Sequence, residues 1–106
     1  MAVQEPSGTV DFDYLEGFAA GDRQVVSEVL SLFLQQAKIW SGSLDAANAG
    51  WGDVVHTIKG AARGVGANLL GDACARAEAD GAEGLPAVRV GLAAAVADIQ
   101  AYIART

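Results

Sequence analysis

The only histidine of the 106-residue chain, His56, lies in the segment GDVVHTIKGAARGVGA, which begins at Gly52. Histidine loses its proton near neutral pH, so a neutral ring nitrogen is available there as a nucleophile. Lys59 follows three residues later, and helical side chains at i and i+3 have Cβ atoms about 5–6 Å apart. Its ammonium group would offset the charge of a phosphoryl group bound to the imidazole. The pair predicts a nucleophilic imidazole with a cation within reach.

The apolar residues of this segment place His56 on the exposed side of a helix. At about 100° per residue they fall roughly opposite the imidazole. This predicted buried face consists of Val54, Ile58, Ala61, Val65 and Leu69. We therefore expect His56 to point to solvent, with Arg63 two turns away and able to act at longer range.

Three glycines follow the same ridge of the predicted helix. Gly52, Gly60 and Gly64 stand at positions −4, +4 and +8 relative to His56. A glycine within a helix costs about 0.5–1 kcal/mol relative to alanine. The expected benefit is clearance, because the missing side chains let another protein surface approach the imidazole. The alternative is that the glycines permit close helix packing, although Gly60 and Gly64 lie nearer the polar side.

Other chemistries find little support in the sequence. The glycine-containing stretch lacks the Gly-Lys-Ser/Thr ending of a nucleotide-binding loop. One histidine without a carboxylate cluster at ligand spacing predicts no metal site, and no nucleophile–base–acid set is visible. The net charge of −6 argues against nucleic acid as a partner. No continuous apolar run approaches the roughly 18 residues of a membrane span. Cys74 is expected to be a small core residue.

The elements that must position this segment are all predicted to be helical. Alanine is abundant, there are only two prolines, and no segment alternates apolar and polar residues as a strand would. After a tail over residues 1–10, we expect helices that start at Asp11, Asp22, about Trp51, Asn68 and about Pro86. The prediction is an all-α protein with one domain over residues 11–106, an antiparallel four-helix bundle with a short additional N-terminal helix.

Apolar stripes at helical spacing predict the core. The first helix carries Phe12, Leu15 and Phe18 on one side, and the second carries Val26, Leu30, Phe33, Ala37 and Trp40. The fourth helix would bury Leu69 or Leu70, Ala73, Cys74 and Ala77, and the last would bury Val88, Leu92, Val96, Ile99 and Ile103. Trp40 and Trp51 are expected to seal one end of the bundle.

The stretch HTIKGAARGVGA resembles the signature of histidine-containing phosphotransfer (HPt) domains. In that family His-x-x-Lys-Gly is followed by small residues and a Gly-Ala pair, which Gly66 and Ala67 match. Leu70, Cys74 and Glu78 are similar to the start of the family's next helix. The chain departs from the family before the histidine, where valine stands in place of the common alanine.

The resemblance implies a cytoplasmic phosphocarrier of a multistep phosphorelay, with neither an ATP site nor a cofactor of its own. It would take a phosphoryl group from the aspartate of one receiver domain to another, and Mg²⁺ would be bound by the receiver. By position, His56 is the acceptor through Nε2, Lys59 balances the phosphoryl charge and Gly60 gives clearance. The docking surface would contain Gly52, Gly60, Arg63 and Gly64.

Two other functions are compatible with the sequence. A helical adaptor would bind a receiver or a kinase without accepting phosphate, and it would tolerate His56→Gln. A dimerising bundle would depend on apolar surface residues, for which Trp40 and Val96 are the expected positions.

Overall fold

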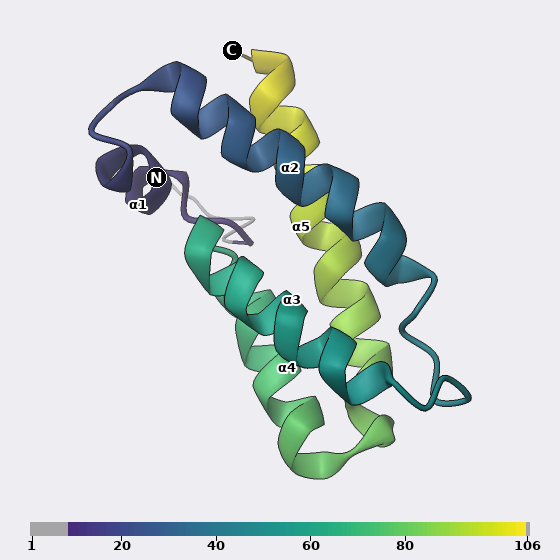
Figure 1. Cartoon of the computed structure of the whole chain (residues 1–106). Helices are drawn as coiled ribbons and strands as arrows, with labels where there is room; N and C mark the ends of the chain where they lie inside the picture. The colour runs from purple at the N-terminus through teal and green to yellow at the C-terminus, as the bar shows by residue number, and fades with distance from the viewer. Residues whose placement is uncertain (1–8, 106) are drawn as a thin grey trace.

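The computed structural model describes residues 9–105, and these residues form helices and connecting turns without a strand (Figure 1). The elements are α1 (Phe12–Phe18), α2 (Arg23–Ser41), α3 (Trp51–Val65), α4 (Asn68–Asp80), the short 3₁₀ helix η1 (Ala82–Gly84) and α5 (Leu85–Arg105). The all-α prediction is therefore confirmed. Most of the predicted tail, residues 1–8, lies outside the described residues, whereas Val10 is buried and its amide donates to Asp98 at 3.1 Å.

Side-chain caps start the first two helices where the sequence places them. The carboxylate of Asp11 accepts a hydrogen bond from the amide of Tyr14, and that of Asp22 accepts from the amides of Gln24 and Val25. Each cap satisfies amides that have no partner within the helix. Both predicted starts are confirmed.

The start of α4 differs from the prediction, because Asn68 is its first residue and not its cap. Gly66 ends α3 in the left-handed region at φ +87°, and the amide of Ala67 donates to the carbonyl of Ala62 at 2.8 Å. Ala67 occupies the cap position without a side-chain hydrogen bond. The two helices are thus joined by a two-residue turn, which leaves no position for Asn68 outside the helix.

Helices α2 to α5 alternate in direction, and α1 lies at the end where α2 begins and α3 ends (Figure 1). They share one apolar core. All five residues of the predicted α2 stripe are buried, and so are Leu70, Ala73, Cys74 and Ala77 of α4. In α5, Val88, Leu92 and Ile99 are buried, while Val96 and Ile103 pack against the core from its edge.

Two predicted core positions are wrong. Phe18 is 76% exposed, because α1 ends at that residue and only Leu15 and the partly buried Phe12 face the other helices. Leu69 is 56% exposed, because it belongs to the first turn of α4 and not to a continuation of α3. Phe12 instead stacks on Tyr102 of α5 with ring centroids 4.2 Å apart, which fixes α1 to the bundle.

The buried face of α3 is also turned relative to the prediction. Its fully buried residues are Val55, Ile58, Ala62 and Val65, whereas Val54 and Ala61 are only partly buried. The shift is toward α4, the element with which α3 makes its most extensive contact. Tertiary packing therefore decides which part of the apolar arc is covered.

The segment Ala82–Arg105, which contains α5, meets the length and composition requirements of a membrane-spanning helix. The mostly buried core helix of a water-soluble protein can meet the same requirements, whereas 22% of this apolar window is buried. Here the apolar residues of one face of α5 are used in the core, where Val88, Ala95 and Ile99 are completely buried.

Replacing Gly66 by alanine should destabilise the protein. A Cβ atom at this position would lie 2.7 Å from the carbonyl oxygen of Asp11, on a backbone at φ +87° that favours glycine. We expect a loss of about 1–3 kcal/mol in the free energy of unfolding, measured by urea denaturation. Gly60→Ala is the control, because its Cβ would meet nothing within 4 Å. It should gain about 0.5–1 kcal/mol from helix propensity. Equal changes in the free energy of unfolding for Gly66→Ala and Gly60→Ala would contradict the conclusion that only Gly66 requires glycine for the fold.

Candidate functional site

His56 lies in the first half of α3 with its imidazole in solvent. The side chain is 73% exposed, in agreement with its expected position on the polar face of the helix. The residue before it, Val55, is completely buried and anchors this turn of α3 in the core. The imidazole is therefore accessible although its backbone is fixed by packing.

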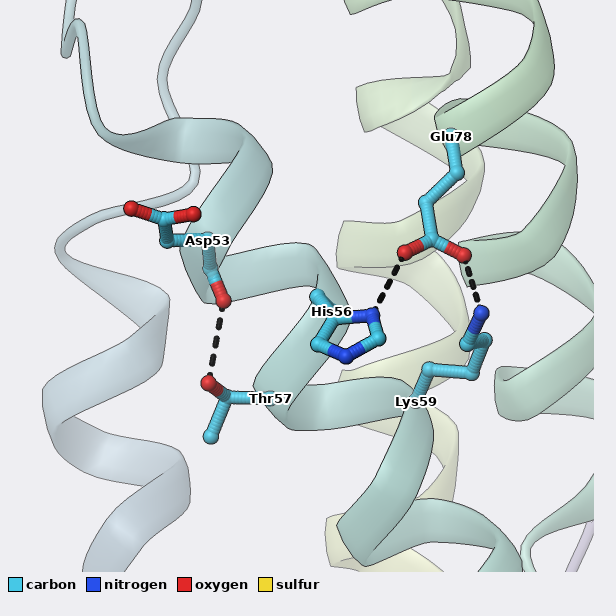
Figure 2. A network of polar contacts seen from close by, with 5 residues as sticks. All are labelled: Asp53, His56, Thr57, Lys59 and Glu78. Atoms are coloured by element: carbon cyan, nitrogen blue, oxygen red, sulfur yellow. Dashed lines mark hydrogen bonds and ion pairs between the residues drawn. The ribbon is translucent and has the colours of Figure 1, made fainter.

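A carboxylate from α4 connects His56 with Lys59 (Figure 2). One oxygen of Glu78, Oε2, lies 2.9 Å from Nδ1 of His56. The other oxygen, Oε1, accepts a hydrogen bond from the ammonium group of Lys59. The side chains of Lys59 and Glu78 are only 22% and 28% exposed. The structure thus joins two predicted site residues through a third residue on another helix.

Sequence reasoning missed this function of Glu78. The residue was visible only as part of the family resemblance, and it lies 22 positions beyond His56. Helical periodicity relates residues within one helix, so it carries no information on a contact between two helices. The α3–α4 turn is what brings the carboxylate to the imidazole.

The carboxylate of Glu78 is held in its ionised form. The hydrogen bond from Lys59 and, second to it, the one from His56 lower the pKa of Glu78 below its ordinary value of 4.5. An ionised carboxylate can only accept hydrogen bonds, so the proton of the neutral imidazole is assigned to Nδ1. The lone pair then belongs to Nε2, which points away from Glu78 (Figure 2).

The three glycines on the His56 ridge leave the surface open. Among residues 9–105, a Cβ atom added at Gly52, Gly60 or Gly64 would meet nothing within 4 Å. Close helix packing is therefore not their role, in contrast to Gly84, where a Cβ would lie 2.7 Å from Cα of Ala77. The open ridge fits the clearance interpretation.

Arg63 lies along α4, and within residues 9–105 it makes no hydrogen bond or ion pair with His56, Lys59 or Glu78. Its side chain covers Gly71, where an added Cβ would be 3.1 Å from Cγ of Arg63. Glycine at position 71 thus makes room for the arginine stem. Arg63 contributes positive charge at the side of the site, two turns from the imidazole.

An apolar groove between α2 and α3 borders the glycine ridge at Gly64. It is lined by Val29, Leu32, Phe33, Gln36, Trp40, Ala61, Gly64 and Val65. Leu32 is 57% exposed, whereas Trp40 is buried and meets Phe33 edge to face. Trp40 is therefore mainly a core residue, and only its edge reaches the groove. The groove itself was not predicted, because two helices contribute to it.

Within residues 9–105, no group of three or more histidine, cysteine, aspartate or glutamate side chains is placed to hold a metal ion. Cys74 is buried on α4 one turn before Glu78. Burial, and after it the negative charge of Glu78, raises the pKa of its thiol to about 11. The thiol therefore stays protonated at neutral pH, as suits a core residue.

The bridge should make stability depend on pH in acid. Because the pKa of Glu78 is lowered on folding, its contribution is complete above the ordinary value of 4.5 and is lost as pH falls through the lowered value. Wild type should exceed Glu78→Gln in urea-denaturation stability at pH 7, and this difference should shrink toward pH 3. Glu28→Gln on α2 removes the same charge without touching the bridge and should keep the wild-type pH dependence. A difference that is unchanged at pH 3 would contradict the bridge.

The chain is similar to a solved histidine phosphotransferase, ShpA from Caulobacter crescentus. The two sequences are 59% identical, the structures superpose with a TM-score of 0.87, and the match covers 92% of this chain and 93% of that one. No protein-family model and no curated protein matches the chain. Identity at this level over nearly the whole chain decides the family. The chain belongs to the histidine phosphotransferases, the HPt proteins of phosphorelay signalling.

Proposed function

We propose that this protein carries a phosphoryl group on Nε2 of His56 from the aspartyl phosphate of one receiver domain to the aspartate of another. The observation that carries the proposal is an exposed imidazole whose Nδ1 is bound to Glu78 and whose Nε2 has no hydrogen-bond partner among residues 9–105. The kinship with a histidine phosphotransferase supports it. An adaptor without phosphotransfer would have no need of this arrangement.

The transfer requires little chemistry from this chain. The lone pair of Nε2 attacks phosphorus, the bond from phosphorus to the aspartyl oxygen breaks, and its electron pair returns to the carboxylate. Glu78 orients the ring through Nδ1, and Lys59, one turn from His56, offsets the added negative charge. Phosphoryl transfer depends mainly on positioning and charge stabilisation, and the receiver would supply Mg²⁺. The chain then needs no ATP site of its own.

The proposed unit is residues 11–106, with α2 to α5 as an antiparallel four-helix bundle and α1 as an addition. We place it in the cytoplasm, where the receivers would be. The proposed docking surface runs along the ridge of Gly52, Gly60 and Gly64 and reaches Arg63. It continues into the groove between α2 and α3, where Leu32 is exposed.

Label transfer tests the carrier function. A panel of receivers phosphorylated on aspartate with ³²P is mixed with the protein, and the label is followed over seconds to minutes. We expect rapid appearance of acid-labile, base-stable label, and none with His56→Gln. That variant should keep its fold, because the imidazole is 73% exposed and the buried residues of α3 are unchanged. If no receiver transfers label to the folded protein, or if His56→Gln still accepts it, the adaptor is the better account.

Substitution of Leu32 tests the docking surface. Leu32→Lys places a charge in the α2–α3 groove, and we expect about a tenfold rise in KM for the phosphorylated receiver, the effect of losing one buried interface side chain. Val90→Lys is the control, because Val90 is also exposed but lines the groove between α4 and α5. Phosphorylation by the small donor phosphoramidate should not change in either variant. Equal KM values for the two variants would contradict docking across α2.

A further inference from the structure

Nδ1 of His56 donates its hydrogen bond to a carboxylate. This carboxylate affects the protonation of the ring once Nε2 carries a phosphoryl group. Glu78 Oε2 lies 2.9 Å from Nδ1 and is kept ionised by Lys59. An ionised carboxylate accepts hydrogen bonds but cannot donate one, whereas an amide side chain can do either. Glu78 therefore stabilises the imidazole ring when Nδ1 is protonated and destabilises it when Nδ1 is not.

Phosphorylation leaves two protonation states of the ring. Attack by Nε2 on phosphorus, with Nδ1 still protonated, yields an N-phosphoimidazolium ring with a positive charge. Loss of the Nδ1 proton would yield a neutral phosphoimidazole with a lone pair on Nδ1. In this structure that lone pair would face the carboxylate of Glu78 at hydrogen-bond distance. Repulsion between them disfavours the neutral ring.

The two states differ in their ability to release the phosphoryl group. When an aspartate oxygen or water attacks phosphorus, the bond from phosphorus to Nε2 breaks and its electron pair returns to Nε2. From the protonated ring the leaving group is neutral imidazole. From the unprotonated ring it is imidazolate, an anion and a far poorer leaving group. Retention of the Nδ1 proton therefore keeps the phosphoryl group transferable.

We infer that Glu78 keeps Nδ1 of phosphorylated His56 protonated and so holds the phosphoryl group in its readily released form. The inference rests on the proposed phosphorylation of Nε2. It gives Glu78 a positioning and charge-stabilising function beyond orientation of the free imidazole. Each delivery then returns the ring to the neutral state with its proton on Nδ1, ready for the next transfer.

The charges around the ring favour this function. On the α4 side, the ring contacts Oε2 of Glu78. On the α3 side, the ammonium group of Lys59 is bound to the other oxygen of this carboxylate, Oε1. Arg63 lies over Gly71, and Asp53 on α3 points away from the imidazole in Figure 2. The negative charge in direct contact with Nδ1 is thus nearer than any of these cations. Coulomb energy falls with distance, so the carboxylate dominates.

The pH dependence of hydrolysis tests the inference without a partner protein. Wild type, Glu78→Gln and the charge-matched control Glu28→Gln are phosphorylated with phosphoramidate, and loss of phosphate is followed from pH 6 to pH 9. Glutamine keeps an acceptor for Nδ1–H but also offers a donor to the bare nitrogen. The midpoint at which hydrolysis slows should therefore fall by about one pH unit in Glu78→Gln, so that its phosphohistidine persists about tenfold longer at pH 8. Glu28→Gln should match wild type.

The outcomes separate this inference from the proposed function. A merely structural role of Glu78 would change the yield of phosphorylation but would leave the pH midpoint in place. If phosphorus is on Nε2 and the midpoints of wild type and Glu78→Gln coincide, the inference is overturned and the carrier function stands. His56→Gln is the blank for ³¹P NMR. If no phosphoryl group is found on His56 after incubation with phosphorylated receivers or with phosphoramidate, the inference and the proposed carrier function are both contradicted.

Discussion

The hydrogen bond between Nδ1 of His56 and Glu78 is the contact on which the rest of the site depends. It leaves Nε2 pointing away from Glu78 (Figure 2), and the second oxygen of the same carboxylate holds the ammonium group of Lys59. Because the two partners stand on α3 and α4, the contact requires these helices to keep a fixed distance and rotation. The two-residue turn of Gly66 and Ala67 and the buried α3–α4 contact supply that constraint. The α3–α4 hairpin is thus the physical basis of an exposed but oriented imidazole.

Glycine serves two opposite purposes in this small fold. At Gly84 the absence of a side chain lets Ala77 approach to a distance that a Cβ would block, and at Gly71 it leaves room for the side chain of Arg63. Along the ridge of Gly52, Gly60 and Gly64 it leaves empty surface instead. The first group contributes to packing within the protein, whereas the second lowers helix stability without any internal gain. Such a cost is understandable where another protein must reach the imidazole.

The sequence alone predicted several features that depend on one helix at a time, although Asn68 as a cap and Phe18 as a core residue were wrong. The caps at Asp11 and Asp22 and the complete buried stripe of α2 follow from local hydrogen bonding and helical period. Features that depend on contacts between two helices could not be predicted from the sequence. The buried arc of α3 is turned by roughly 40° from its apolar centre, because α4 covers one side. For the same reason neither the contact of Glu78 with His56 nor the groove beside Leu32 has a signal in the spacing of residues.

The central claim is that Nε2 of His56 is the atom that accepts the phosphoryl group. The most direct measurement is ³¹P and ¹⁵N NMR of the protein, labelled with ¹⁵N in histidine, after phosphorylation by a receiver. The account predicts coupling of phosphorus to Nε2, with Nδ1 still bonded to hydrogen. Coupling of phosphorus to Nδ1 would contradict it, because that nitrogen could not then donate to Glu78.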